Sequence, residues 1–205
     1  MFQLALNYFD IDGGRAEPVR LALHIGGITF EDRRFAFSEF AEQRKTTPLN
    51  KVPTLFVNDE QITQCNAMLR FAGKLANLYP TEPLPALHCD EILDAVEDAT
   101  HDIVSTFGLS DDALITARAN LVSGSLTRYL TWAEARLTQH GGEFFADQRL
   151  TVADLKMAVL IKWLSSGKLE HVPADLVTNV APKLQQQVER IYQLPKISSY
   201  YAQSH

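Results

Sequence analysis

The feature that most constrains this chain of 205 residues is a change of hydrophobic pattern at a proline-rich segment. Residues 79–85 contain three prolines, which remove backbone donors and restrict the residues before them, so we expect no helix to run through this stretch. Before it, apolar residues alternate between strand and helix spacing; after it, they recur only at helix spacing. The pattern therefore predicts two domains, residues 1–79 and 86–205, joined by a linker at 80–85.

The first domain is predicted to be a small α/β layer, and the second to be all-helical. The order before the linker is β-α-β-α-β-β-α, which is typical of an α/β architecture. Pro18 fits a helix only in its first turn, so the first helix should begin near residue 16. The expected strands are 2–6, 29–33, 54–57 and 61–63, and the expected helices are 16–25, 38–45 and 66–78.

Composition excludes several classes of protein. The chain is 46% hydrophobic and 21% charged, which is ordinary for a globular protein, and no apolar run approaches the roughly 18 residues that a membrane-spanning helix needs. Its start lacks the pattern of a secretory leader, and two cysteines are too few for a disulfide scaffold, so a cytoplasmic location is expected. The net charge is −6 without a basic block, so neither nucleic acid nor a membrane is an expected partner.

Three positions at predicted strand ends could carry chemistry. Tyr8 follows a strand and precedes a loop into a helix, where α/β sheets bind ligands, so its phenol could donate to an anion or simply reach solvent. A cis bond between Val52 and Pro53 would expose the amide and carbonyl of Val52 to a peptide-like ligand. Gln64 and Cys65 lie at a helix start, which favours a carboxylate, although Cys65 alone is more typical of a small buried hydrophobe.

The helix around residues 90–103 carries an aspartate ladder at strict i,i+4 spacing, formed by Asp90, Asp94, Asp98 and Asp102. Like charges at this spacing disfavour a helix by roughly 0.2–0.5 kcal/mol per pair. Either the ladder is a solvated face, or some of its carboxylates face a cation across a groove or from another subunit. Neither the ladder nor the histidines have the spacing of metal ligands, so no metal is predicted.

Residues 150–155 have the pattern of a helix start. Thr151 can cap the amide of Asp154, while the carboxylate of Asp154 reaches back to the amide of Thr151. Leu150 and Leu155 stand where a hydrophobic staple would fix the entry angle of the chain. We interpret this motif as structural.

Together these segments resemble cytosolic glutathione transferases, and most closely the sigma class, which includes glutathione-dependent prostaglandin D synthases and cephalopod lens crystallins. The resemblance implies a thioredoxin-like N-terminal domain, an all-helical C-terminal domain and a two-fold homodimer. It also implies glutathione as co-substrate, with no other cofactor. The matching segments keep their order and spacing over nearly the whole chain: Tyr8–Leu21, Asn50–Leu55, Gln64–Phe71 and Leu150–Asp154.

The resemblance assigns the catalytic role to Tyr8, whose hydroxyl would stabilise the thiolate of glutathione. Arg15 would support the same region electrostatically. Lys51 and Val52 would form the segment that pairs with the cysteinyl backbone. Gln64 and Cys65 would hold the γ-glutamyl carboxylate, and Asp98 would reach the glutamyl amine across the dimer interface. The full set of implied glutathione-binding residues is Tyr8, Arg15, Phe40, Arg44, Lys51, Val52, Pro53, Gln64, Cys65 and Asp98.

The chain departs from the family pattern at several of these positions. Cys65 replaces the usual serine and loses a hydroxyl contact, while Phe40 replaces a tryptophan and loses an indole donor. Arg44 replaces a lysine but keeps a charge for the glycyl carboxylate. The loop before Arg15 is also one residue longer than in many relatives. We therefore expect weaker or altered glutathione binding, not its absence.

The function predicted from the sequence is conjugation of the glutathione thiolate to small apolar electrophiles. The second substrate is expected between the domains, near Phe9 and Phe107. A glutathione-dependent isomerase uses the same thiolate and is not distinguished by sequence; a structural or binding relative is the other alternative. A thiol-oxidoreductase using Cys65 is disfavoured, because Cys65 lies at the γ-glutamyl end of the implied site.

Overall fold

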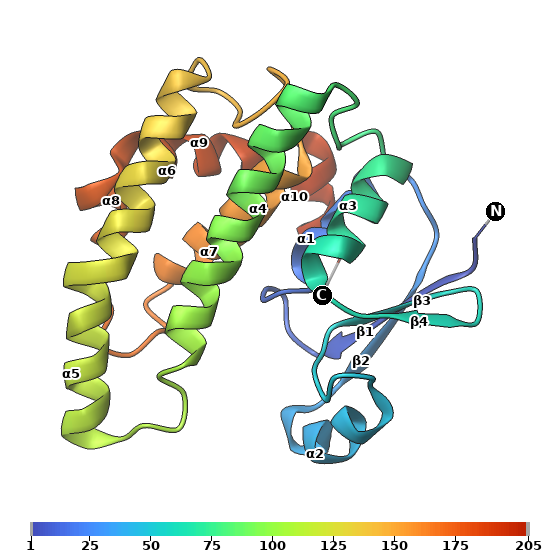
Figure 1. Cartoon of the computed structure of the whole chain (residues 1–205), viewed down its shortest axis with the longest axis horizontal. Coiled ribbons are helices and arrows are strands. Elements are labelled where there is room, and N and C mark those ends of the chain that lie inside the picture. Colours follow the sequence, from blue (N-terminus) through green and yellow to red (C-terminus); the bar gives the residue numbers. More distant parts are fainter. Residues whose placement is uncertain (1, 204–205) are drawn as a thin grey trace.

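The computed structural model describes residues 2–203; residues 204–205, the end of the predicted second domain, lie outside this range. A layer of sheet and helices stands beside a helical bundle, and in the view of Figure 1 helix α4 lies between the sheet and helices α5 and α6. None of the helices within residues 2–203 has both the length and the apolar character to cross a membrane.

The first domain contains a four-stranded sheet in the order β2-β1-β3-β4, in which β1 and β2 are parallel and the other neighbours are antiparallel. Helices α1 and α3 pack against each other. This is the thioredoxin-like arrangement that the resemblance implied. The elements are β1 (Leu4–Phe9), α1 (Glu17–Ile25), β2 (Glu31–Phe35), a 3-10 turn (Phe37–Glu39), α2 (Phe40–Gln43), a second 3-10 turn (Arg44–Thr46), β3 (Thr54–Val57), β4 (Glu60–Ile62) and α3 (Cys65–Leu75).

Strand β1 extends three residues beyond the predicted end at residue 6. The extension is held by pairing with β2, in which Tyr8 lies opposite Arg34 and Phe9 opposite Phe35. Tyr8 is therefore part of the sheet, at the carboxyl end of a central strand. Such strand ends are where α/β sheets place ligands.

The second domain is all-helical over its described residues, as predicted. Helix α7 lies at its centre, in contact with α4, α9 and α1, and every residue from 152 to 161 is buried. The elements are α4 (Pro83–Val104), α5 (Asp111–Leu121), a π-helical turn η3 (Val122–Leu126), α6 (Thr127–Gln139), α7 (Val152–Leu164), α8 (Leu176–Val180), α9 (Pro182–Gln193) and α10 (Pro195–Gln203).

Helix α4 begins inside the proline-rich segment and does not run through it. It begins at Pro83, so residues 83–85 of the predicted linker belong to the helix. The amides in the first turn of a helix have no partner within the helix, so Pro83 and Pro85 can lie there without removing a hydrogen bond.

The predicted capping box at the start of α7 is confirmed. The Asp154 carboxylate accepts hydrogen bonds from the backbone N–H of Thr151 at 2.8 Å and from its hydroxyl at 2.8 Å. It also accepts the N–H of Phe145 at 3.0 Å and the side-chain amide of Gln187 at 2.9 Å. Asp154 thereby ties together α7, α9 and the loop before α7, which fixes the central helix.

Candidate active site

Tyr8 has the environment of a hydrogen-bond donor. Its side chain is buried, and the backbone N–H of Arg15 donates to its hydroxyl oxygen at 3.3 Å. Burial raises the pKa of Tyr8, while that backbone hydrogen bond and the charges of Arg15 and Arg20 act in the opposite direction. The hydroxyl therefore stays protonated at neutral pH, so its own proton is available for an anion while its oxygen is held by Arg15.

The close approach of the loop to Tyr8 depends on Gly14. Gly14 has φ +67°, and a Cβ built at this position would lie 2.7 Å from the Tyr8 hydroxyl oxygen. Both the backbone conformation and the lack of space require glycine. Gly14 is thus what allows the amide of the next residue, Arg15, to reach Tyr8.

The buried side chain of Arg20 anchors the loop between β1 and α1. It donates to the carbonyl oxygen of Ile11 at 2.9 Å and forms ion pairs with Asp32 at 3.0 Å and Glu17 at 3.2 Å. Its guanidinium carbon lies 5.9 Å from the centroid of the Tyr8 ring. Arg20 fixes the loop between β1 and α1 and places positive charge behind Tyr8.

Four side chains from separate elements meet where the two domains join, and we call Arg15, Cys65, Glu97 and Lys156 the junction cluster. Arg15 Nε lies 2.6 Å from Glu97 Oε1, and Lys156 Nζ lies 2.8 Å from Glu97 Oε2. The Cys65 thiol donates to Glu97 Oε2 at 3.0 Å, and Lys156 Nζ lies 3.6 Å from Cys65 Sγ. Lys156 also donates to the side-chain oxygen of Asn66. Glu97 is the shared acceptor at the centre.

The junction cluster perturbs its titratable groups in opposite directions. Burial alone would raise the pKa of Glu97, but the charge of Lys156 and the hydrogen bonds from Cys65, Lys156 and Arg15 lower it to about 2. Burial raises the pKa of the Cys65 thiol to about 11. Cys65 is therefore a protonated donor at neutral pH, which argues further against a role as a nucleophile.

The first two residues of the aspartate ladder on α4, Asp90 and Asp94, face a cation. Arg70 of α3 forms ion pairs with Asp90 at 2.7 Å and with Asp94 at 3.2 Å. Asp94 also accepts the side-chain amide of Asn66 at 2.7 Å. Asp98 is exposed and forms no ion pair within residues 2–203, so its contact with a partner subunit stays a prediction. The residue that pairs with Arg15 is its neighbour, Glu97.

The remaining backbone-binding positions lie at the ends of strands. The peptide bond between Val52 and Pro53 is cis. Pairing of Thr54 with Asn7 brings this bond to the same end of the sheet as Tyr8, and Lys51 beside it is exposed.

Gln64 precedes α3 and is exposed. It has φ +71°, a region that non-glycine residues occupy at a cost of about 1–3 kcal/mol and in which functional residues are often found.

Phe40 and Arg44 lie with Phe9 in one aromatic group on the first domain. The ring of Phe9 stacks on Phe37 at 4.4 Å and meets Phe40 edge-on at 5.2 Å. The guanidinium carbon of Arg44 lies 5.5 Å from the Phe40 ring centroid. Phe37, which is 63% exposed, leaves this group open to solvent.

Phe107, the other residue predicted for the second substrate, belongs to a different aromatic group. Its ring lies 6.4 Å from that of Trp163, and the guanidinium carbon of Arg118 is 5.6 Å from it. Among residues 2–203 no ring contact joins Phe107 to Phe9, so the structure does not bring the two together directly.

The two tyrosines near the C-terminus, Tyr200 and Tyr201, pack against other side chains. Tyr200 is buried against His24 at 5.2 Å, and Tyr201 lies 5.5 Å from Tyr192. Lys162 Nζ is 4.0 Å from the Tyr201 ring centroid. These contacts give both tyrosines a packing role in the fold.

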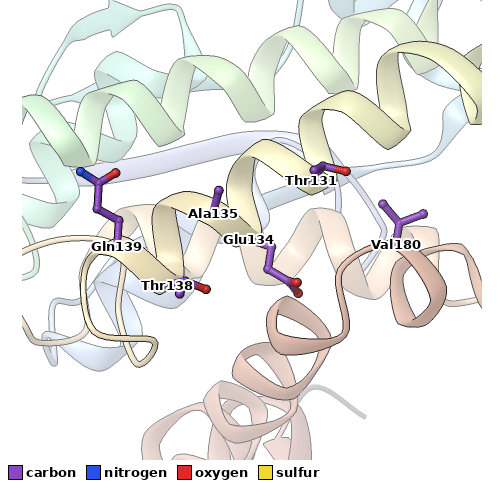
Figure 2. Close-up of a pocket in the computed structure, with 6 residues that line it drawn as sticks. All are labelled: Thr131, Glu134, Ala135, Thr138, Gln139 and Val180. Carbon is purple, nitrogen blue, oxygen red and sulfur yellow. The ribbon is translucent and has the colours of Figure 1, made fainter.

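An open pocket of about 520 Å³ lies elsewhere, between α6 and α8. Figure 2 shows its lining side chains on α6, with Val180 across from them. Glu134 in this pocket accepts the backbone N–H groups of Lys183 at 2.7 Å and Leu184 at 3.2 Å, and so caps α9. None of the predicted site residues lines it. No group of three or more potential metal ligands occurs in the part of the chain that the structure describes.

Sequence reasoning overlooked Glu97, Lys156 and Gly14. Lys156 left a usable signal, because it is a cation inside the otherwise apolar run that follows the capping box. Glu97 left none, since it lies among other acids on the same helix. The role of Gly14 depends on a side chain six residues earlier and is visible only in three dimensions.

Comparisons with known proteins identify relatives of this chain and structures that share its fold. Glutathione S-transferase 1 of Ascaris suum is 27% identical over 207 residues, covering 99% of this chain and 97% of that protein. The structure of prostaglandin synthase D of Nilaparvata lugens shares the fold with a TM-score of 0.87 at 24% identity, covering 98% of each chain. A sigma class glutathione transferase of Fasciola hepatica shares it with a TM-score of 0.83 at 22% identity, covering 100% of this chain and 97% of that one.

Two family models match the chain along most of its length. The model of the glutathione S-transferase N-terminal domain matches residues 4–74, and that of the glutathione S-transferase C-terminal domain matches residues 97–204. Together they cover both parts of the fold, in the same order. The chain therefore belongs to the glutathione S-transferase family.

Proposed function

We propose that this transferase conjugates glutathione to small apolar electrophiles, with Tyr8 as the residue that stabilises the thiolate. The observation that carries the proposal is the Tyr8 hydroxyl itself. It is buried and protonated, and its oxygen is already bound by the Arg15 amide at 3.3 Å. The remaining proton can therefore be donated to a sulfur anion.

The expected chemistry is stabilisation of charge followed by positioning of two reactants. A free thiol ionises near pH 8.5, so most of it is protonated at neutral pH, and each unit of lowered pKa corresponds to about 1.36 kcal/mol. A hydrogen bond to an anion has this order of magnitude. The thiolate then attacks the electrophilic carbon, a carbon–sulfur bond forms, and the leaving group departs as an anion.

The rest of glutathione is assigned to residues at the same end of the sheet. The γ-glutamyl carboxylate would bind at Gln64 and Cys65, at the start of α3, where free backbone amides favour an anion. The cysteinyl backbone would pair with Val52, next to the cis bond. Lys51, which is exposed beside Val52, belongs to the same segment, and the exposed cation Arg44 would bind the glycyl carboxylate.

A conjugation assay with glutathione and a simple aryl halide tests the proposal. We expect Tyr8→Phe to lower kcat/KM by at least about tenfold, the size of one lost charge-assisted hydrogen bond. Tyr79→Phe is the matched control, because it removes a hydroxyl bound to Asp90 at 3.0 Å and should leave activity unchanged.

Three other results would redirect the proposal. Equal activity of wild type and Tyr8→Phe would move the donor to Arg15 or a loop amide. Glutathione binding without conjugation would favour the isomerase or the non-enzymatic alternative. Activity that collapses with a chelator would overturn the prediction that no metal is required.

We also propose a two-fold homodimer located in the cytoplasm, acting in detoxification. Asp98 is exposed on α4 and free to reach a partner, which supports this arrangement. Sedimentation should give twice the mass of the chain. Asp98→Asn should raise the KM for glutathione without dissociating the dimer.

A further inference from the structure

Lys156 is buried in the middle of the central helix of the second domain. It is 5% exposed, in a stretch of α7 where every neighbour is also buried. Removing an ammonium group from water costs several kcal/mol unless partners replace the water. Its three partners are Glu97 and Cys65 of the junction cluster and the neighbouring Asn66.

These contacts connect the lysine to Tyr8 through two intervening residues, Glu97 and Arg15. Lys156 engages one oxygen of the Glu97 carboxylate, and Arg15 engages the other at 2.6 Å. The backbone N–H of the same arginine is the group that donates to the Tyr8 hydroxyl. The position of the Arg15 loop, and with it the orientation of Tyr8, therefore depends on a carboxylate that Lys156 holds.

The charges of the cluster do not cancel. Arg15 and Lys156 are cations, Glu97 is an anion and the Cys65 thiol is protonated, which leaves one net positive charge. On the far side, Asn66 separates the cluster from Asp94, which is paired with Arg70. On the near side, the buried Arg20 lies behind Tyr8, but its charge is balanced by Glu17 and Asp32, so it adds no net positive charge.

We propose that Lys156 is a positioning residue for glutathione activation, which fixes Glu97 against Arg15 and leaves the junction cluster with a net positive charge that favours the bound thiolate. This inference rests on the proposed function. A purely structural role explains the burial less well, because an apolar side chain of similar length would fill the same space without a desolvation cost. A cation is useful here only if a negative charge arrives.

Lys156→Met and Lys156→Arg test the inference by removing and then restoring the charge. The readouts are the pH dependence of the ultraviolet absorbance of glutathione thiolate in the complex, and kcat and KM for conjugation. We expect Lys156→Met to raise the pKa of the bound thiol by about one unit, and so to lower kcat/KM at neutral pH by about tenfold. Lys156→Arg should recover most of this loss.

Two further variants separate charge from folding. Lys156→Gln keeps a hydrogen-bonding side chain without the charge and should shift the thiol pKa in the same direction, which covers the case in which the methionine variant fails to fold. Lys162→Met removes an exposed cation two turns further along α7, where it contacts Tyr201, and should leave the thiol pKa unchanged.

The outcomes distinguish this inference from the proposed function. If wild type binds glutathione as a thiolate and the neutral variants titrate at the same pH, the role of Lys156 is wrong while the function stands. If wild type neither binds glutathione nor ionises its thiol, both are overturned. A thiol pKa that rises in Lys156→Met and Lys156→Gln, but not in Lys156→Arg, supports the inference.

Discussion

The protein shifts the pKa values of two carboxylates, Asp154 and Glu97, in opposite directions. Asp154, at the start of α7, receives only neutral donors: two backbone N–H groups, a hydroxyl and a side-chain amide. Burial raises its pKa to about 6 despite these hydrogen bonds. Glu97 in the junction cluster faces two cations and a thiol, and its pKa falls to about 2.

The difference shows that Asp154 stabilises the fold, whereas Glu97 organises the charged side chains beside Tyr8. Neutral donors fix Asp154 in place and join one helix start to its neighbours, and they bring no cation that could attract a ligand. The two cations around Glu97, Arg15 and Lys156, keep its carboxylate ionised and give the cluster a net positive charge next to Tyr8. The following predictions test this contrast, beginning with the largest expected effect.

Asp154→Ala should cost about 4 kcal/mol in the free energy of unfolding, because several buried donors lose their acceptor at once. Thiolate chemistry in the protein that remains folded should be unchanged. Denaturant unfolding measures the first effect, and conjugation per folded molecule measures the second. Asp154→Asn keeps one acceptor and should lose about half as much. A lower specific activity in folded Asp154→Ala would break the contrast.

Glu97→Gln should change how the free energy of unfolding depends on pH in the acidic range. The pKa of Glu97 is lowered from 4.5 to about 2, so its contribution is present above pH 4.5 and is lost as the pH falls toward 2. After allowance for its partial exposure, we expect about 2 kcal/mol over this window. The free energy of unfolding of Glu97→Gln should therefore fall less steeply than that of wild type.

The contribution of Asp154 to stability should change with pH in the opposite direction. Its pKa is raised from 3.8 to about 6, so its contribution is complete below pH 3.8 and is lost as the pH rises through 6. Acid titrations of Glu97→Gln and Asp154→Asn should thus deviate from wild type in opposite directions. Parallel curves would show that the two carboxylates do not differ as described.

Gly14→Ala should disturb the site without disturbing either carboxylate. A methyl group would lie 2.7 Å from the Tyr8 hydroxyl oxygen on backbone with φ +67°, which costs about 1–2 kcal/mol. We expect kcat/KM to fall by about tenfold. Gly124→Ala is the control, because nothing lies within 4 Å of a Cβ there and its φ is not positive. Full activity of Gly14→Ala would disprove the close approach to Tyr8.

Cys65→Ser should give the smallest effect, a few-fold lower KM for glutathione, or about 0.5 kcal/mol. The hydroxyl would keep the donor to Glu97 and add a stronger one for the γ-glutamyl carboxylate. Cys89→Ser, a substitution at a fully buried cysteine on α4, should lower stability without changing KM. Cys65→Ala should retain conjugation; complete loss in a folded variant would restore Cys65 as a candidate nucleophile.

The fold was predictable because each element carries its own signal. The period of apolar residues, Pro18 in a first turn and the capping box at Thr151 are local features, and each matches the structure. The start of α4 was misplaced because proline is compatible with a first turn as well as with a linker. The end of β1 was misplaced because it depends on pairing with β2, which is not local.

The site was predictable only in part. Tyr8, Arg15 and Cys65 follow from the family motifs, and the structure joins Tyr8 to Arg15 and Arg15 to Cys65 through Glu97. Glu97 and Lys156 could not be paired from the sequence, since periodicity indicates which side of a helix is buried but not what it meets. The resemblance assigns a role to Asp98 but not to Glu97, the preceding residue, which reaches Arg15.

The arrangement of the junction cluster has a consequence for synthesis of the protein. Lys156 lies 91 residues beyond Cys65, and the domain that contains Arg15 and Cys65 is translated before the lysine is made. On the ribosome, the first domain can emerge with Tyr8 and Arg15, yet the ammonium group that gives the junction cluster its net positive charge is still absent. A nascent chain therefore acquires its full complement of charge beside Tyr8 only after α7 has emerged and docked, so chemical competence comes late in biosynthesis.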